Sequence, residues 1–135
     1  LCPNPDYILD PRYIDIAKHN VDEAGGSFRI THDIEDGYRG ADVVYAKSWG
    51  ALPYFGAWEG EAPMRALLKH FIVDEEKMAL TNNGLFSHCL PLRRNIKATD
   101  GVMDSPNCIA IAEAGNRLHV QKAIMDTLIN HPEIS

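Results

Sequence analysis

The sequence predicts an α/β domain built around a mostly parallel sheet. Short apolar runs rich in β-branched and aromatic residues alternate with longer segments of helical spacing, an order typical of βα units. The 135 residues, 45% of them hydrophobic, suit one globular domain with a single core and are too few for two conventional domains. We therefore expect one sheet whose strands are connected by helices.

The first expected helix begins near Pro11 and ends before Gly25. Asp10 is a good N-cap, proline fits the first helical position, and the pair Gly25-Gly26 supplies a C-terminal stop. Because such a helix follows a strand in a βαβ unit, the opening "LCP" is interpreted as the end of a strand whose body lies upstream. The domain is thus expected to be truncated at its N-terminus.

Four apolar segments are expected to form strands: residues 28–32, 42–47, 84–91 and 107–111. A short helical turn precedes the second strand, and helical sequence runs from about Met64, with an interruption around residues 70–73. The closing segment is expected to be an amphipathic helix, because its apolar residues recur at helical spacing: Leu118, Ile124, Met125, Leu128 and Ile129.

Composition argues against several classes of partner. The 19 acidic and 13 basic side chains give a net charge of −6, so no nucleic-acid partner is expected. No signal peptide and no apolar segment of bilayer-spanning length is visible, so no membrane partner is expected. The three cysteines, Cys2, Cys89 and Cys108, match neither a disulfide framework nor a zinc spacing. They favour a reducing, cytoplasmic setting and no metal site.

Two polar motifs are expected at one rim of the sheet, because ligands of an open parallel sheet bind beyond the carboxyl ends of its strands. The motifs are "YAKSWG", which contains Lys47, and "SHCLPLRR", which contains Cys89. His88 and Cys89 are neighbours that point to opposite faces of a strand, which excludes a nucleophile–base dyad between them. Cys89 is either a small buried residue, the more common case, or a thiol beside an anion pocket.

Several cations are expected near this rim. Arg93, Arg94 and Lys97 lie close together in an otherwise acidic chain, and they form either a solvated basic turn or an anion pocket. Lys47 either extends its ammonium group to the surface or reaches into the crevice. Arg117, near the start of the closing helix, is either a surface residue or a ligand-binding one. The residues alone leave these alternatives open.

The tract "HCLPLRRNIKATDGVMDSPNCIAIAEAGNRLHVQKAIM" resembles the aspartate/ornithine carbamoyltransferase superfamily. Together with "ADVVYAKSWGAL", it is similar to the branch that acts on N-acetylornithine, and the "SMG" motif of ordinary ornithine carbamoyltransferases is missing after "YAKSWG". The resemblance implies a three-layer, Rossmann-like fold with helices on both faces of the sheet. Residues 1–135 would be an incomplete C-terminal domain that binds the ornithine derivative.

The resemblance also implies an activity. Carbamoyl phosphate would donate its carbamoyl group to the side-chain amine of N-acetyl-L-ornithine, in arginine biosynthesis, within a homotrimer that needs no cofactor. The alternatives are N-succinylornithine or ornithine as the acceptor, or a non-catalytic binding domain from a truncated or degenerate paralogue. The family's "STRT"-type phosphate loop and "HPxQ"-type segment do not occur in this sequence, so the 135 residues are expected to be inactive alone.

Four positions match functional residues of that family. The resemblance implies that Cys89 and Leu90 meet carbamoyl phosphate and the attacking amine, the thiol by helping to deprotonate the amine and the leucine through its backbone carbonyl. It implies that Arg117 holds the carbamoyl oxygen and that Lys47 pairs with the α-carboxylate of the substrate. The closing helix of such enzymes packs on another domain, so apolar side chains on it are expected to be partly uncovered: Leu118, Met125 and Leu128.

Lys97 is the subject of a separate hypothesis. The like charges of Arg93 and Arg94 disfavour its ammonium form, and a neutral amine can add carbon dioxide. The branch that acts on acylated ornithine is compatible with a carboxylated lysine at this position. The alternative is an ordinary surface lysine.

Overall fold

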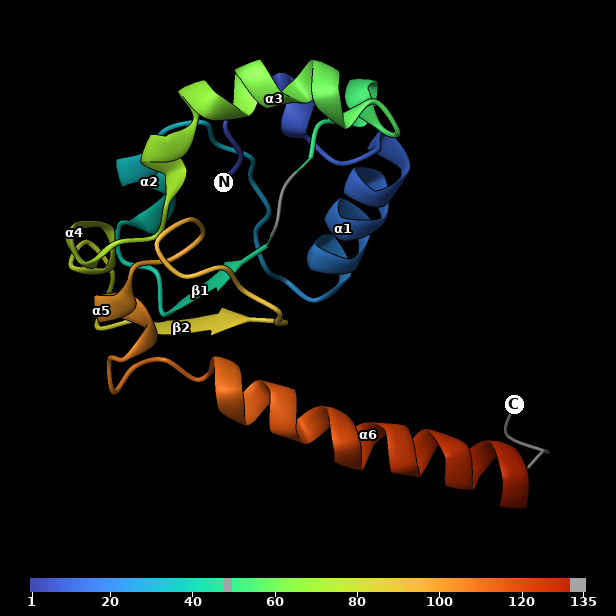
Figure 1. The fold of residues 1–135 in the computed structure, drawn as a ribbon. Helices are drawn as coiled ribbons and strands as arrows, with labels where there is room; N and C mark the ends of the chain where they lie inside the picture. The colour runs from blue at the N-terminus through green and yellow to red at the C-terminus, as the bar shows by residue number, and fades with distance from the viewer. Residues whose placement is uncertain (48–49, 132–135) are drawn as a thin grey trace.

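The computed structural model describes residues 1–47 and 50–131, so Ser48, Trp49 and residues 132–135 lie outside the described part. It is a mixed α/β fold in which short helices and a small parallel sheet form one body, from which a long helix extends (Figure 1). The helices and strands are α1 (Pro11–Glu23), α2 (Ile34–Tyr38), β1 (Val43–Ala46), α3 (Trp58–Leu67), α4 (Glu75–Met78), β2 (Leu85–His88), α5 (Asp100–Met103) and α6 (Ala110–Asn130). The described residues also form the 3-10 turns η1 (Pro5–Tyr7), η2 (Leu52–Tyr54) and η3 (Lys69–Phe71).

The sheet consists of β1 and β2, which pair in parallel within the described residues. Val43 lies opposite Leu85, and Ala46 lies opposite His88. Both strands therefore end at the same edge of the sheet, and their parallel direction confirms the prediction for these two segments.

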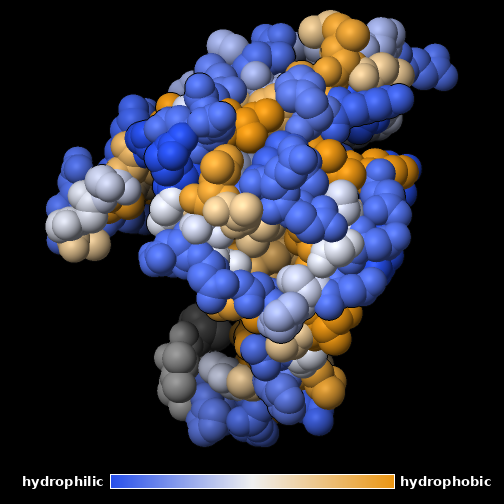
Figure 2. All heavy atoms as spheres, turned by 90° about the vertical axis from the view of Figure 1, so that its left-hand side faces the viewer, coloured by the Kyte–Doolittle hydropathy of each residue, from blue (hydrophilic) through white to orange (hydrophobic). Residues whose placement is uncertain are grey.

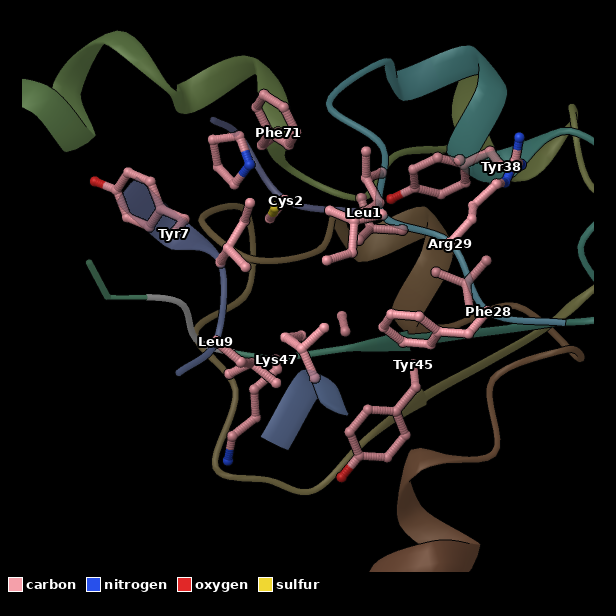
Figure 3. Close-up of a pocket in the computed structure, with 18 of the residues that line it drawn as sticks. Leu1, Cys2, Tyr7, Leu9, Phe28, Arg29, Tyr38, Tyr45, Lys47 and Phe71 are labelled. Carbon is pink, nitrogen blue, oxygen red and sulfur yellow. The ribbon is translucent and has the colours of Figure 1, made fainter. Parts of the chain in front are cut away.

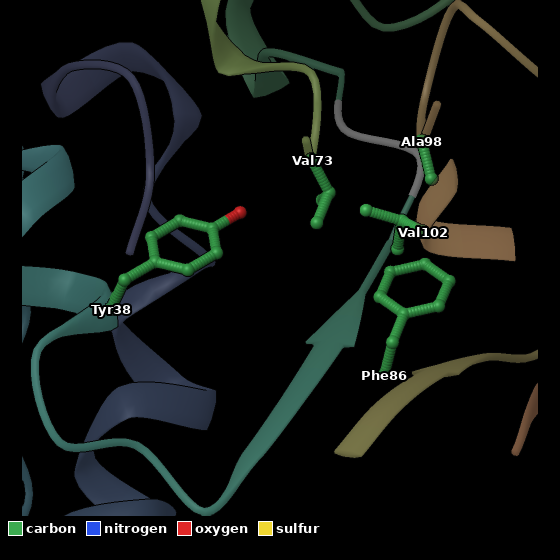
Figure 4. Close-up of a cluster of buried hydrophobic side chains, with 5 residues drawn as sticks. All are labelled: Tyr38, Val73, Phe86, Ala98 and Val102. Carbon is green, nitrogen blue, oxygen red and sulfur yellow. The ribbon is translucent and has the colours of Figure 1, made fainter. Parts of the chain in front are cut away.

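The core packs against one side of β2. Phe86 is fully buried, at 0% exposure, and forms a cluster with four other buried side chains (Figure 4): Tyr38, Val73, Ala98 and Val102. The Val73 N–H donates to the Lys97 carbonyl at 2.9 Å, and the Thr99 N–H donates to the Val73 carbonyl at 3.0 Å. These two bonds fix the backbone of the segment that carries Lys97.

Helix α1 forms as predicted from its boundary residues. The Asp10 carboxylate accepts a hydrogen bond from the Arg12 N–H at 2.9 Å, and Pro11 occupies the start of the helix. Gly25 follows the last turn with a φ of 68°, in the left-handed region that glycine adopts without steric cost. Both ends of α1 are thus set by local side-chain and backbone chemistry.

Two of the four predicted strands are absent from the described structure. Residues 28–32 run without regular hydrogen bonding, and Cys2 reaches them through one backbone bond, from its N–H to the Thr31 carbonyl at 3.1 Å. The interpretation of "LCP" as the end of a strand whose body lies upstream stays a prediction. Residues 107–111 contribute a single bridge, between Cys108 and Phe86, before α6 begins at Ala110. Alanine-rich sequence with good helix formers explains this second error.

Helix α3 begins at Trp58, earlier than the predicted start near Met64. The glycine and proline content of this region indicated a loop, yet Pro63 lies inside the helix. Glu59 and Glu61 stand in its first turn, where negative charge interacts favourably with the helix dipole. The predicted interruption is confirmed, because η3 separates α3 from α4.

Candidate active site

The carboxyl ends of β1 and β2 bring together two side chains that are 42 residues apart in the sequence. Lys47 follows β1 and Cys89 follows β2, and the Lys47 Nζ donates to the Cys89 Sγ at 3.5 Å. The Lys47 side chain is exposed, whereas Cys89 is half-buried. The structure thus places both residues at one rim of the sheet, where the sequence predicted them.

His88 is hydrogen-bonded to the turn that follows β2. Its side chain is almost completely buried, and Nδ1 accepts a hydrogen bond from the Leu90 N–H at 2.9 Å. Burial lowers the pKa of His88, the nearby positive charge of Lys47 lowers it further, and the carboxylate of Glu113 opposes this effect. The imidazole is therefore neutral at pH 7, with its proton on Nε2, and Nε2 has no hydrogen-bond partner among the described residues.

Leu90 adopts a backbone conformation that leucine rarely tolerates. Its φ is 47°, in the left-handed region, and the following bond to Pro91 is cis. The strain of this positive φ persists where surrounding contacts hold the residue in place, and here the hydrogen bond from the Leu90 N–H to His88 supplies such a contact. The turn therefore has one defined shape at the position predicted to present a carbonyl group.

The first turn of α6 forms the third part of the rim. The Ser87 Oγ donates a hydrogen bond to the Glu113 carboxylate, and Ser87 is 4% exposed. Tyr45, which lies opposite Ser87 in the sheet, has a raised pKa because of partial burial, then because of the neighbouring Cys89 thiol and Glu113 carboxylate. Sequence reasoning missed Ser87, Glu113 and Tyr45. The available signal was the two-residue alternation, which puts Tyr45 on the same face of β1 as Lys47.

Arg117 lies one helical turn after Glu113 on α6. Its side chain is exposed and makes no hydrogen bond or ion pair with the residues that the structure describes. Residues four positions apart share a helix face, so Arg117 lies on the face of α6 that Glu113 turns toward β2. The structure thus leaves Arg117 beside the rim without a direct contact to Lys47 or Cys89.

Lys97 is half-buried, and its pKa is lowered. Burial is the largest cause, followed by the positive charges of Arg65 and Arg93, while the carboxylate of Glu61 opposes them. The sequence-based explanation through Arg93 and Arg94 is wrong in one respect. Arg94 donates to Asp100 at 2.7 Å and also pairs with Asp104, so these carboxylates neutralise its charge.

These carboxylates belong to a hydrophilic surface at the other end of the sheet. Figure 2 shows the face over α2, α4 and α5, where hydrophilic residues predominate and hydrophobic ones show between them. The Thr99 Oγ1 donates to the Glu75 Oε2 at 2.8 Å on this side of the molecule. Arg94 is therefore part of a surface network and not of the rim.

Glu61 is a completely buried carboxylate that sequence reasoning assigned to a loop. Its Oε1 accepts a hydrogen bond from the Ala51 N–H at 2.9 Å, and its Oε2 lies 3.7 Å from the Arg65 Nε. It also contributes to the raised pKa of Tyr7, for which burial is the largest cause. Glu61 thus connects the backbone at Ala51 to helix α3.

A cavity of about 660 Å³ lies on the side of β1 that is remote from β2 (Figure 3). All residues from 43 to 47 line it, as do residues 28–30. Successive residues of a strand point to opposite faces, so a cavity that touches every one of them runs along the strand edge. Its other lining residues are mostly apolar and include Leu1, Tyr7, Leu9 and Phe71.

The described residues contain no group of three histidine, cysteine, aspartate or glutamate side chains that could hold a metal ion. In the same part of the chain, no helix is long and apolar enough to cross a membrane.

The sequence of this chain is similar to those of several carbamoyltransferases. The N-acetylornithine carbamoyltransferase of Xanthomonas campestris pv. campestris is 74% identical over 129 residues, which are 96% of this chain and 38% of that protein. The enzyme of the same name from Xylella fastidiosa strain 9a5c is 70% identical over 95% of this chain and 38% of its own length. The ornithine carbamoyltransferase of Thermococcus kodakarensis is 39% identical over 88% of this chain and 37% of its own length.

The fold of this chain is also similar to solved structures of N-acetylornithine transcarbamylases. A variant of N-acetyl-L-ornithine transcarbamylase complexed with PALAO matches with a TM-score of 0.91 and 73% identity, over 95% of this chain and 39% of that chain. Acetylornithine transcarbamylase complexed with acetylcitrulline matches with a TM-score of 0.90 and 74% identity, over 94% of this chain and 38% of that chain. This chain therefore spans less than two fifths of the length of these relatives.

The family model described as "Aspartate/ornithine carbamoyltransferase, Asp/Orn binding domain" matches residues 1–128, nearly the whole chain. The rim of the sheet, with Lys47 after β1 and Cys89 after β2, lies inside this match. The chain belongs to the aspartate/ornithine carbamoyltransferase family, in the part that forms the Asp/Orn binding domain.

Proposed function

We propose that this chain is the amino-acid-binding part of an N-acetylornithine carbamoyltransferase. The whole enzyme transfers the carbamoyl group of carbamoyl phosphate to the side-chain amine of N-acetyl-L-ornithine, and the products are N-acetylcitrulline and phosphate. The observation that carries the proposal is the meeting of Lys47 and Cys89 at 3.5 Å, in a chain 74% identical to a relative with this name. In this proposal, the exposed Lys47 ammonium pairs with the α-carboxylate of the substrate.

The reaction requires a neutral amine and a stabilised oxyanion. The side-chain amine attacks the carbamoyl carbon, and phosphate leaves from the tetrahedral intermediate. Free amines are mostly protonated at pH 7, so a base near the amine is needed, and the Cys89 sulfur takes this role in the proposal. Arg117 and the backbone of Leu90 hold the carbamoyl group, and the guanidinium stabilises the charge that develops on its oxygen. No step uses a cofactor.

The proposal includes a carboxylated Lys97. The Lys97 ammonium loses one proton, and the neutral amine then adds carbon dioxide and loses a second proton, so that a cation becomes a carbamate anion. The lowered pKa of Lys97 favours the neutral amine, and the positive charges of Lys47 and Lys97 both act on His88. A carbamate on Lys97 would replace one of these two positive charges near His88 with a negative one. Intact mass measured under carbon dioxide without acid should show one added carboxyl group, which a Lys97→Arg variant should lack.

The 135 residues form an incomplete domain in this proposal. The cavity along the edge of β1 has the lining expected of a slot for one more parallel strand, between β1 and residues 28–30. Such a strand would extend the sheet toward the three-layer, Rossmann-like arrangement predicted from the sequence. The whole enzyme is proposed to be a homotrimer with active sites at subunit boundaries, and the phosphate loop missing from this sequence is supplied by its other domain.

Calorimetry of the whole enzyme, saturated with carbamoyl phosphate, tests the substrate. N-acetylornithine should bind more tightly than N-succinylornithine or ornithine. Stronger binding of N-succinylornithine or ornithine would replace the proposed acceptor with that compound. Binding of an acylated ornithine without any turnover would instead favour a non-catalytic binding domain.

A further inference from the structure

Helix α6 is attached to the rest of the molecule mainly through its beginning. Figure 1 shows it extending away from the body, and its described contacts to other elements are chiefly with β2. Apolar side chains farther along the helix are more than half exposed, for example Ile124 at 52% and Ile129 at 74%. The orientation of α6 therefore depends on few contacts.

One of these contacts is a charge-assisted hydrogen bond. The Ser87 Oγ donates to the Glu113 carboxylate, and the same carboxylate lies close enough to Tyr45 of β1 to add to the rise that burial causes in the pKa of its hydroxyl. Ser87 is a firm anchor, because it is 4% exposed and lies within the paired part of β2. Hydrogen bonds to an ionised acceptor are about twice as strong as neutral ones.

This bond connects the two elements that carry proposed catalytic groups. Ser87 lies two residues before Cys89, and Glu113 lies one helical turn before Arg117. Rotation of α6 about its axis would move Glu113 and Arg117 together, since residues four apart share a helix face. Holding Glu113 against β2 therefore fixes the direction in which Arg117 extends toward the turn at Cys89 and Leu90.

We infer that Glu113 is a positioning residue that acts through its hydrogen bond with Ser87 to aim Arg117 at the carbamoyl group. This inference rests on the proposed function. Arg117 is exposed and has no described partner that would orient it, so its placement depends on the helix that carries it. A misplacement of about 1 Å can cost a factor of about 100 in rate.

Kinetics of the whole enzyme test the inference. Glu113→Ala and Ser87→Ala should each lower kcat about tenfold or more, while the KM for the acylated ornithine changes less than about threefold. Glu113→Gln keeps an oxygen that accepts the Ser87 hydrogen, so it should restore kcat to within about threefold of wild type. Ser87→Ala is a small change on a buried strand, and it provides the result if Glu113→Ala does not fold.

A matched control comes from a second hydroxyl–carboxylate pair. Thr99 donates to Glu75 at 2.8 Å on the far side of the molecule, so Glu75→Ala removes a similar bond away from the rim. This variant should keep wild-type kcat. An equal loss in Glu75→Ala and Glu113→Ala would mean that general destabilisation is responsible, and the inference would be wrong.

The Arg117→Ala background gives the decisive comparison. Because Glu113 is inferred to act through Arg117, adding Glu113→Ala to Arg117→Ala should lower kcat less than about twofold further. A full tenfold loss in that background would contradict the inference. Failure of the proposed function would look different, because the wild-type enzyme itself would then transfer no carbamoyl group to an acylated ornithine.

Discussion

At the scale of single residues, the sequence located Lys47 and the Cys89 thiol at the rim, but it wrongly grouped Arg94 with them and missed the carboxylates of Glu61 and Glu113. Lys47 and Cys89 could be placed because each follows an apolar strand, and parallel strands end at one edge. Glu61 and Glu113 could not be recognised, because the burial of a carboxylate depends on which distant segment covers it. Ala51 contacts Glu61, and Ser87 contacts Glu113. Neither contact can be predicted from the residues next to these carboxylates in the sequence.

Replacement of Lys47 should weaken substrate binding more than catalysis. Lys47→Met in the whole enzyme removes a charge-assisted contact worth about 1.5–3 kcal/mol, so the KM for N-acetylornithine should rise about 10- to 100-fold with a smaller change in kcat. Steady-state kinetics would measure both. Lys18→Met, on the exposed surface of α1, should leave both constants unchanged. An unchanged KM in Lys47→Met would contradict the assigned role.

His88 should make stability depend on pH. Burial lowers its pKa in the folded chain, so the unfolded chain takes up a proton first as the pH falls below about 6.5. Stability should therefore decrease between about pH 7 and pH 5. His88→Asn cannot take up this proton, and its side-chain oxygen can still accept from the Leu90 N–H, so the decrease should be smaller. Urea unfolding at several pH values would measure this decrease in the free energy of unfolding. The control is His119→Asn, at an exposed position, which should leave the decrease unchanged.

At the scale of elements, the sequence predicted those helices whose boundaries or apolar spacing depend on residues close together in the chain. The cap and proline at the start of α1 and the apolar spacing of α6 were sufficient for those helices. Residues 28–32 have the composition of a strand, but a strand forms only beside a partner, and they receive one backbone bond from Cys2. Residues 107–111 pair once and then enter α6, so tertiary context decided between strand and helix.

The N-cap of α1 offers a direct measure of local stabilisation. Asp10→Ala removes the acceptor for the Arg12 N–H and should lower the free energy of unfolding by about 1 kcal/mol. Asp15→Ala, at an exposed position within the same helix, should change it by less than about 0.5 kcal/mol. Urea unfolding of both variants makes the comparison. Equal effects would mean that the cap contributes nothing specific.

At the scale of the whole molecule, apolar surface remains uncovered along β1 and on α6, and also at single residues such as Phe55 and Leu67. On α6, Leu118, Met125 and Leu128 are each more than half exposed, as the family resemblance implied. Exposed apolar area of this kind favours association. The chain spans 38% of the length of the relative to which it is 74% identical, and we propose that other parts of the whole enzyme cover these surfaces.

The 135-residue chain should therefore bind a hydrophobic dye and self-associate. Light scattering and dye fluorescence would show both effects, and both should decrease in the whole enzyme, in which these surfaces are proposed to be covered. A substitution that makes α6 more polar, Leu128→Lys, should reduce self-association without changing the secondary structure. A monodisperse monomer that binds no dye would contradict this expectation.

Because Lys47 follows β1 and Cys89 follows β2, their contact also depends on the register in which the two strands pair. A slip of β2 by one residue would put Cys89 opposite Ala46 and turn its thiol to the other face of the sheet. Far-ultraviolet circular dichroism would barely detect such a slip, because the content of strand would stay the same. Affinity for the acylated ornithine would disappear, so binding of the substrate measures whether the two strands have been joined in the correct alignment.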